Sequence, residues 1–200
     1  MNKKLLFILL LFSSVPKTIF AQELSLSISP PIVEVMIMPG KQTEQTFSII
    51  NEGMDGYASV KVVPFVPSDE EGNINVIDNP NISDLAKYEN WFSLFEDKFF
   101  LRQGEKKNIK LRISPPADAQ ERDYYFTLLY EVNNQGTTLK IGANLLISVS
   151  KDGKPYKKAR IIEFSAPKLI DSLGKLNYTL RIENTGQYFF KPTGTISIEP

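Results

Sequence analysis

Apolar and polar residues alternate along most of the chain from Leu24 to Val149, in short stretches that Pro, Gly, Asn and Asp separate. A period of two residues predicts half-buried β-strands, and no long stretch has the spacing of a helix. Strands at such short intervals are typical of an antiparallel β-sandwich of the immunoglobulin type. The expected strands cover residues 24–29, 32–38, 43–51, 57–65, 73–77, 98–102, 107–113, 124–132 and 138–149.

Two places interrupt this alternation. At Ser29-Pro30-Pro31, two consecutive residues lack the N–H that a β-ladder needs, which predicts a first strand that kinks or changes sheets. Between Asn81 and Phe95 the spacing of apolar residues fits one short helix, whose apolar face would plug one end of the sandwich.

One strand pattern occurs twice, with Asn51 and Asn184 at matching positions 133 residues apart. Residues 46–53 and 179–186 both read T-x-x-I-x-N-x-G. Each copy alternates and then stops at Asn-x-Gly, residues that tolerate the left-handed backbone of a tight turn. A repeat at this spacing predicts two copies of one β-module.

The segment 151–158 contains Gly, Pro and several charges, and we expect it to be a linker. It would separate an immunoglobulin-like sandwich over residues 22–150 from the start of a second one over residues 159–200. The second unit offers expected strands at 159–164, 175–183 and 193–199 only. Three strands do not close a sandwich, so we expect tandem all-β domains of which the second is incomplete, either because the sequence is a fragment or because a partner strand completes it.

Residues 1–21 have the form of a secretory signal peptide, with Lys3 and Lys4 before a short apolar run and a cleavage site between Ala21 and Gln22. Without this segment the 23 basic residues fall to 20, against 23 acidic ones. The mature chain is therefore slightly acidic, which disfavours nucleic acid as a partner. The sequence contains no Cys, so an exported form would be stable through core packing alone.

The amino-acid composition also excludes most classes of enzyme as functions for this chain. The chain contains no His and no Cys, which rules out Ser-His-Asp triads, Cys-His pairs and His-ligated zinc. Phosphate-binding glycine loops and nucleophile elbows are missing as well. We therefore expect a protein that is not an enzyme and needs neither cofactor nor metal.

An acidic cluster and an aromatic cluster are the remaining candidates for a functional site. Asp69-Glu70-Glu71 could act in acid–base chemistry or hold calcium together with Asn73, but adjacent acids on a turn usually face water. Trp91 and the four phenylalanines that follow it could stack on a carbohydrate. Packing in the core is the better interpretation, since a sandwich needs large apolar residues there.

Several short motifs carry a resemblance to bacterial proteins. Residues 29–34, Pro39-Gly40, the strand that ends at Asn51 and the Gly104-Glu105 turn before a strand ending at Pro115 resemble the first domain of WxL-interacting surface proteins. Residues 116–125 look like the segment before the sixth strand of periplasmic fimbrial chaperones. Both resemblances imply an immunoglobulin-like fold.

The chaperone family implies two basic residues, one in the first strand and one in the last, that clamp the terminal carboxylate of a subunit. Residues 24–38 contain no Lys or Arg, and Lys140 could supply only the second member. The resemblance therefore favours a scaffold over a chaperone.

Together these patterns predict an exported bacterial protein of the cell surface or periplasm that binds a protein partner. Binding is expected along an exposed edge strand at residues 138–149, through Leu139, Lys140, Ile141, Leu145 and Ile147; burial of this strand in the middle of a sheet is the other possibility. The alternative functions are a periplasmic assembly chaperone and an accessory domain of a secreted glycan-active enzyme. A membrane anchor beyond Pro200 would fit the scaffold.

Overall fold

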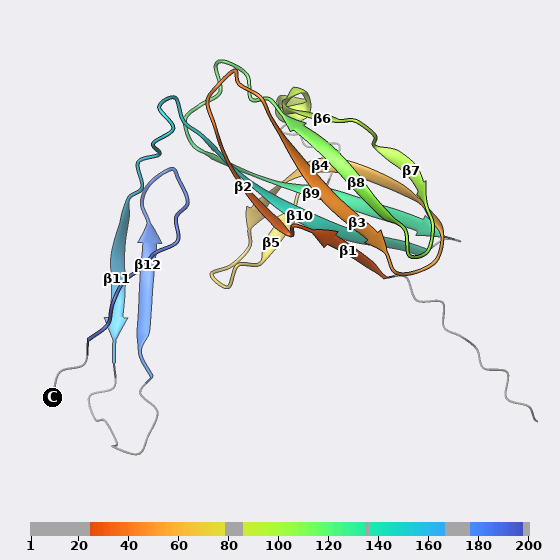
Figure 1. Cartoon of the computed structure of the whole chain (residues 1–200). Coiled ribbons are helices and arrows are strands. Elements are labelled where there is room, and N and C mark those ends of the chain that lie inside the picture. Colours follow the sequence, from red (N-terminus) through yellow and green to blue (C-terminus); the bar gives the residue numbers. More distant parts are fainter. Residues whose placement is uncertain (1–24, 79–85, 135–136, 167–176, 198–200) are drawn as a thin grey trace, which may run out of the picture.

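The computed structural model describes residues 25–78, 86–134, 137–166 and 177–197. The predicted signal peptide and its cleavage site at Ala21 and Gln22 lie outside these residues. Residues 25–150, here called the first module, form two facing β-sheets, and a two-stranded ribbon stands beside them (Figure 1). The all-β sandwich expected from the alternation is confirmed.

The first sheet has the strand order β1-β3-β8-β6. The second sheet has the order β2-β10-β9-β4-β5, and β7 pairs with the other part of β4. The ribbon consists of β11 and β12. In the first sheet the bounds are β1 Leu26–Ser29, β3 Thr43–Asn51, β8 Lys106–Ile113 and β6 Phe92–Leu94. In the second sheet they are β2 Ile32–Ile37, β10 Thr137–Val149, β9 Asp123–Asn134, β4 Gly56–Pro67, β5 Ile74–Val76 and β7 Lys98–Leu101. The ribbon strands are β11 Ala159–Ser165 and β12 Thr179–Asn184.

The two prolines do move the chain between sheets. The Ser29–Pro30 peptide bond is cis, and it separates β1, which pairs antiparallel with β3, from β2, which pairs parallel with β10. One stretch of sequence thus contributes an edge to each layer. The predicted change of sheet is confirmed.

The predicted helix is wrong over its described part. Residues Ala86–Trp91 form a 3₁₀ turn, and Phe92–Leu94 pair with β8 as an edge strand. The expected plug nevertheless exists, because Trp91 is 5% exposed and packs against Tyr88, Tyr124 and Phe126. Residues 81–85 of the predicted helix lie outside the described residues.

The core lies between the two sheets and follows from the alternation. In β3, Phe47 and Ile49 are fully buried, while the neighbouring Thr46 is exposed and Ser48 is half-buried. The facing sheet contributes a matching row from β9 and β10. Its fully buried members include Leu128, Tyr130, Val132, Leu145 and Ile147.

The Asn51 side chain holds the chain where β3 ends. Its Oδ1 accepts the Gly53 N–H at 3.1 Å, and its Nδ2 donates to the carbonyls of Met54, Leu101 and Arg102 at 2.7, 3.3 and 3.2 Å. The strand predicted to stop at Asn51-x-Gly53 does end at Asn51, and the asparagine amide fixes the turn that follows.

Candidate functional site

Strand β10 changes its surroundings halfway along its length. From Asn144 to Ser148 it pairs with β2 on one side and β9 on the other, and the pairing with β2 continues to Val149. From Thr137 to Ala143, here called the open half of β10, it pairs only with β9 among the described residues. A strand paired on one side leaves backbone N–H and C=O groups that can pair with another chain.

This register divides the residues predicted to bind a partner. Leu145 and Ile147 lie opposite Val33 and Val35 of β2, and both are fully buried. Their expected place on an exposed edge is wrong, because the parallel pairing with β2 makes this half of β10 an internal strand. Leu139, Lys140 and Ile141 lie in the open half.

The open half presents an apolar row at the border between the two sheets. Leu139 and Ile141 are partly exposed and continue the inward-facing row that Ala143 and Leu145 begin. Ile141 packs against the core, as do Leu26 and Ile28 of β1, and β1 lies beside β10. At this border, partly exposed apolar side chains therefore lie beside backbone groups that pair on one side only within the part of the chain that the structure describes.

Lys140 points to the outer face of the sheet and is held by two carboxylates. Its Nζ lies 2.6 Å from Glu131 Oε1 and 3.3 Å from Asp78 Oδ2, while Lys61 Nζ lies 2.7 Å from Asp78 Oδ1. The hydrogen bonds to Glu131 and Asp78 raise the pKa of Lys140. This ammonium already has its counter-ions, so it is poorly suited to clamp the carboxylate of a partner.

A second polar arrangement joins the first module to the ribbon. Asp123, at the start of β9, is 9% exposed. Its carboxylate accepts the Ser148 hydroxyl at 2.6 Å, the Tyr125 hydroxyl at 3.4 Å and the backbone N–H of Phe189. Burial raises the pKa of Asp123, and these hydrogen bonds partly offset that effect.

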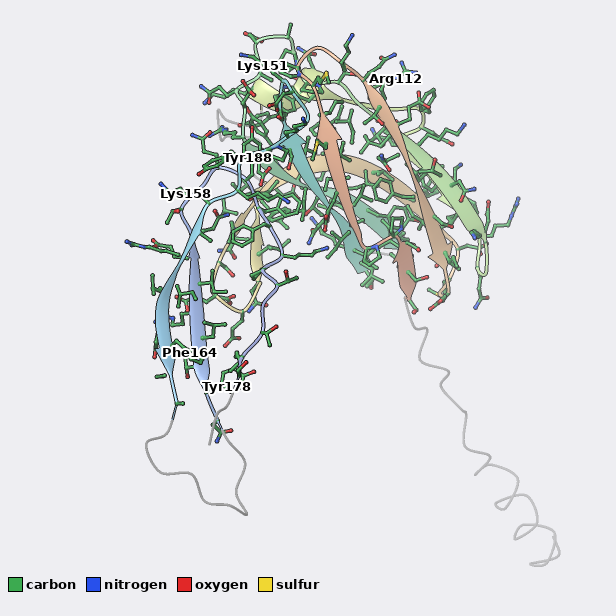
Figure 2. The ribbon with its side chains drawn as sticks, turned by 60° about the vertical axis from the view of Figure 1, so that its left-hand side comes forward. Arg112, Lys151, Lys158, Phe164, Tyr178 and Tyr188 are labelled. Carbon is green, nitrogen blue, oxygen red and sulfur yellow. The ribbon has the colours of Figure 1, made fainter. Side chains whose placement is uncertain are left out.

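The neighbouring residues complete this junction. Tyr188 is 8% exposed, and its hydroxyl donates to the Val149 carbonyl at 3.0 Å. The Asp123 N–H donates to the Gln187 carbonyl at 3.0 Å. Figure 2 shows Tyr188 where the ribbon meets the sandwich, with Phe164 and Tyr178 toward its far end. The sequence patterns did not predict this junction, although an acidic residue at the start of an apolar strand, here Asp123, is a signal that could have pointed to it.

The ribbon has one charged face and one apolar face. On the charged face, Arg160 bonds Glu183, and Arg181 reaches Glu70 of the first module at 2.5 Å. On the other face, Phe164 lies opposite Leu180 and Ile161 lies opposite Ile182. These four side chains are between 37% and 65% exposed. The predicted strand at residues 193–199 is not formed within its described part.

In the acidic turn at Asp69-Glu70-Glu71, the Asp69 carboxylate forms hydrogen bonds within the turn itself. Asp69 accepts the N–H groups of Glu71 and Asn73 at 2.9 and 3.0 Å, and it also bonds the Asn73 side chain. Gly72 adopts a φ of 92° in this turn. Hydrogen bonds lower the pKa of Asp69. No cluster of metal-ligating side chains occurs within the described residues.

The aromatic cluster divides between core and surface. Trp91 and Phe99 are buried, and Phe92 packs partly against the core. Phe95 and Phe100 are 60% and 44% exposed. The prediction of core packing is confirmed for the first three and wrong for these two.

None of the helices within the described ranges is long and apolar enough to cross a membrane.

Comparisons with known proteins add similarities at the level of the fold. No family model matches the sequence, and no curated protein matches it either. Among solved structures, the PapD-like domain 7 of human CEP192 is 14% identical with a TM-score of 0.44, covering 63% of this chain and 85% of that one. A chaperone–tip adhesin complex of CFA/I fimbriae biogenesis is 14% identical with a TM-score of 0.47, covering 82% and 68%.

A third similar structure is an enzyme. A family 123 glycoside hydrolase from Clostridium perfringens is 8% identical with a TM-score of 0.44, and the match covers 63% of this chain but 27% of the hydrolase. The immunoglobulin-like fold rests on the strand pairing described above.

Proposed function

We propose that this chain is an exported protein without enzymatic activity that binds an extended segment of another envelope protein along the open half of β10. The main support is the register of β10. Residues 137–143 pair on one side only among the described residues, directly beside the partly exposed Leu139 and Ile141. An incoming strand would gain backbone hydrogen bonds from the edge and bury its apolar side chains against this border between the sheets.

The same geometry favours a scaffold over a chaperone that grips a terminal carboxylate. Neither β1 nor β2 contains Lys or Arg. Lys140 is bound to Glu131 and Asp78, so releasing it would break two ion pairs. A segment within a partner chain fits this edge better than a chain terminus. Export rests on the predicted signal peptide at residues 1–21.

A binding measurement with matched variants tests the proposal. The probe is a ten-residue peptide with Val at alternate positions and Thr between them. Binding of this peptide is followed by NMR of the labelled protein. We expect the amide signals of the open half of β10 to shift, and Ile141→Lys to weaken binding at least tenfold. The matched control is Ile161→Lys on the ribbon, which should leave binding unchanged. Equal binding by both variants would refute the proposal.

A further inference from the structure

The outer face of the first sheet carries a row of polar residues along β8. On the inner face of this strand, Ile109, Leu111 and Ile113 are at most 2% exposed and line the core. Because side chains alternate along a strand, the residues between them point to the outer face. These outward residues are Lys106, Asn108, Lys110 and Arg112. The row lies within the sheet, since β8 has β3 on one side and β6 on the other.

Two of the basic side chains in this row have no counter-ion. Arg112 bonds Glu44 of β3 at 2.9 Å. Lys106 and Lys110 are exposed and form no ion pair within the part of the chain that the structure describes. Four residues of strand separate these two lysines, so their Cα atoms lie about 13 Å apart. The chain without its signal peptide has more acidic than basic residues, and this face has the opposite sign of charge.

An exposed aromatic ring adjoins the row. Phe95 directly follows β6, and its N–H donates to the Lys110 carbonyl at 3.4 Å. The guanidinium carbon of Arg112 lies 5.3 Å from the centre of the Phe95 ring, and Phe95 is 60% exposed. The ring is therefore held against the outer face of β8 and remains largely accessible. A ring in such a position can stack on the apolar face of a sugar.

Short polar side chains occupy the surface around these groups. Thr46 of β3 lies opposite Lys110, and Ser93 of β6 lies opposite Arg112. Asn108 stands between the two lysines of β8. Thr46, Ser93 and Asn108 are exposed, and their hydroxyl and amide groups both donate and accept hydrogen bonds. These groups match the hydroxyls of a sugar, whereas a lipid surface would use the lysines alone.

From this arrangement we infer that the outer face of the first sheet binds an acidic polysaccharide. One sugar would stack on Phe95, and acidic groups of the polymer would pair with Lys106 and Lys110. Sugar hydroxyls would bond Thr46 and Asn108. A single sugar is too short to reach both lysines, so the glycan would extend along β8. Figure 2 shows Arg112 on the side of the sandwich turned away from the ribbon, so the ribbon leaves this face open.

The probe is a hexamer of galacturonic acid, a linear glycan with one carboxylate on each sugar. Binding is followed by NMR of the whole labelled chain. We expect saturable shifts of the amides of β8 and Phe95, and weaker binding at higher salt because the charged contacts are exposed to solvent. The fully methyl-esterified hexamer has the same backbone without the charges and should bind about tenfold more weakly.

Each variant of this face has a matched control elsewhere in the chain. Lys110→Glu should weaken binding about threefold to tenfold. Lys154→Glu makes the same change of charge in the linker and should leave binding unchanged. Phe95→Ala should also weaken binding about threefold to tenfold. Phe100→Ala removes a ring that is 44% exposed on the other sheet and should have no effect.

Two further controls separate this site from folding and from the proposed function. Trp91, the single tryptophan, is buried in the first module and reports whether that module stays folded in each variant. Ile141→Lys alters the open half of β10 and should leave binding of the hexamer intact, so the two sites can fail separately.

Several results would overturn the inference of a glycan site. These are equal binding of the two hexamers, equal weakening by Lys110→Glu and Lys154→Glu, and no saturable shifts at millimolar hexamer. Binding to vesicles of phosphatidylglycerol in preference to the acidic hexamer would also overturn it, because it would assign the face to a lipid surface.

Discussion

Removing the Asn51 side chain should be far more costly than removing that of Asn184, although both occupy the same motif. Asn51 is fully buried and makes four hydrogen bonds to backbone groups around the β3, β7 and β8 strand ends. Asn184 is exposed and makes two, to Tyr188 and Gly186. Water can replace the partners of Asn184 and cannot easily reach those of Asn51.

The magnitude follows from these bonds. A buried hydrogen bond contributes about 1 kcal/mol net, and a polar group left without a partner costs about 1–3 kcal/mol. Asn51→Ala should therefore lower the free energy of unfolding by about 3–4 kcal/mol, whereas Asn184→Ala should lower it by less than about 1 kcal/mol. Asn51→Asp should be at least as damaging as Asn51→Ala, because it directs a negative charge at three carbonyl oxygens.

Urea denaturation followed by Trp91 fluorescence measures this difference. Trp91 is 5% exposed in the first module, so its signal reports the domain that contains Asn51. The midpoint of Asn51→Ala should fall while the slope of free energy against urea stays unchanged. A loss below about 1 kcal/mol for Asn51→Ala would refute the view that the amide holds this corner together.

Three further outcomes are expected. Tyr130→Phe should leave stability unchanged or raise it by about 1 kcal/mol in urea denaturation, because the described residues offer no partner to its buried hydroxyl. Gly142→Ala should destabilise by about 1–3 kcal/mol in the same assay, since a Cβ there would lie 2.5 Å from Thr127 Cγ2. For Asp123 burial raises the folded-state pKa above the ordinary aspartate pKa of 3.8, so its stabilising effect is complete below that ordinary value and is lost as the pH rises through the folded-state pKa. The stability of wild type relative to Asp123→Asn should therefore increase on acidification from pH 7, and a constant difference would contradict the burial of that carboxylate.

Local patterns were sufficient for most of the fold. The strand expected at residues 43–51 is β3 with the same bounds. The alternation predicted it well because one face of this strand packs in the core and the other face is more exposed. The sheet change at Ser29-Pro30-Pro31 followed from the missing N–H groups. The helix expected before Phe95 failed because pairing of Phe92–Leu94 with β8 outweighed a weak local preference.

The candidate site was only partly predictable. The alternation of β10 identified Leu139 and Ile141, but it is the same in both halves of the strand and could not show that pairing with β2 begins only at Asn144. The junction at Asp123 was missed because its partners Ser148 and Phe189 come from distant parts of the chain. Contacts between distant segments leave little trace in a local pattern.

The most direct test of the central claim is site-specific photo-crosslinking from the open half of β10 in intact cells. A photoreactive residue replaces Lys140, in the open half of β10, or Lys110, which lies on β8 of the opposite sheet. The account predicts one protein adduct from position 140 and none from position 110, with the crosslinked peptide drawn from an extended segment of alternating apolar residues. No adduct from position 140, or the same adduct from both positions, would contradict it.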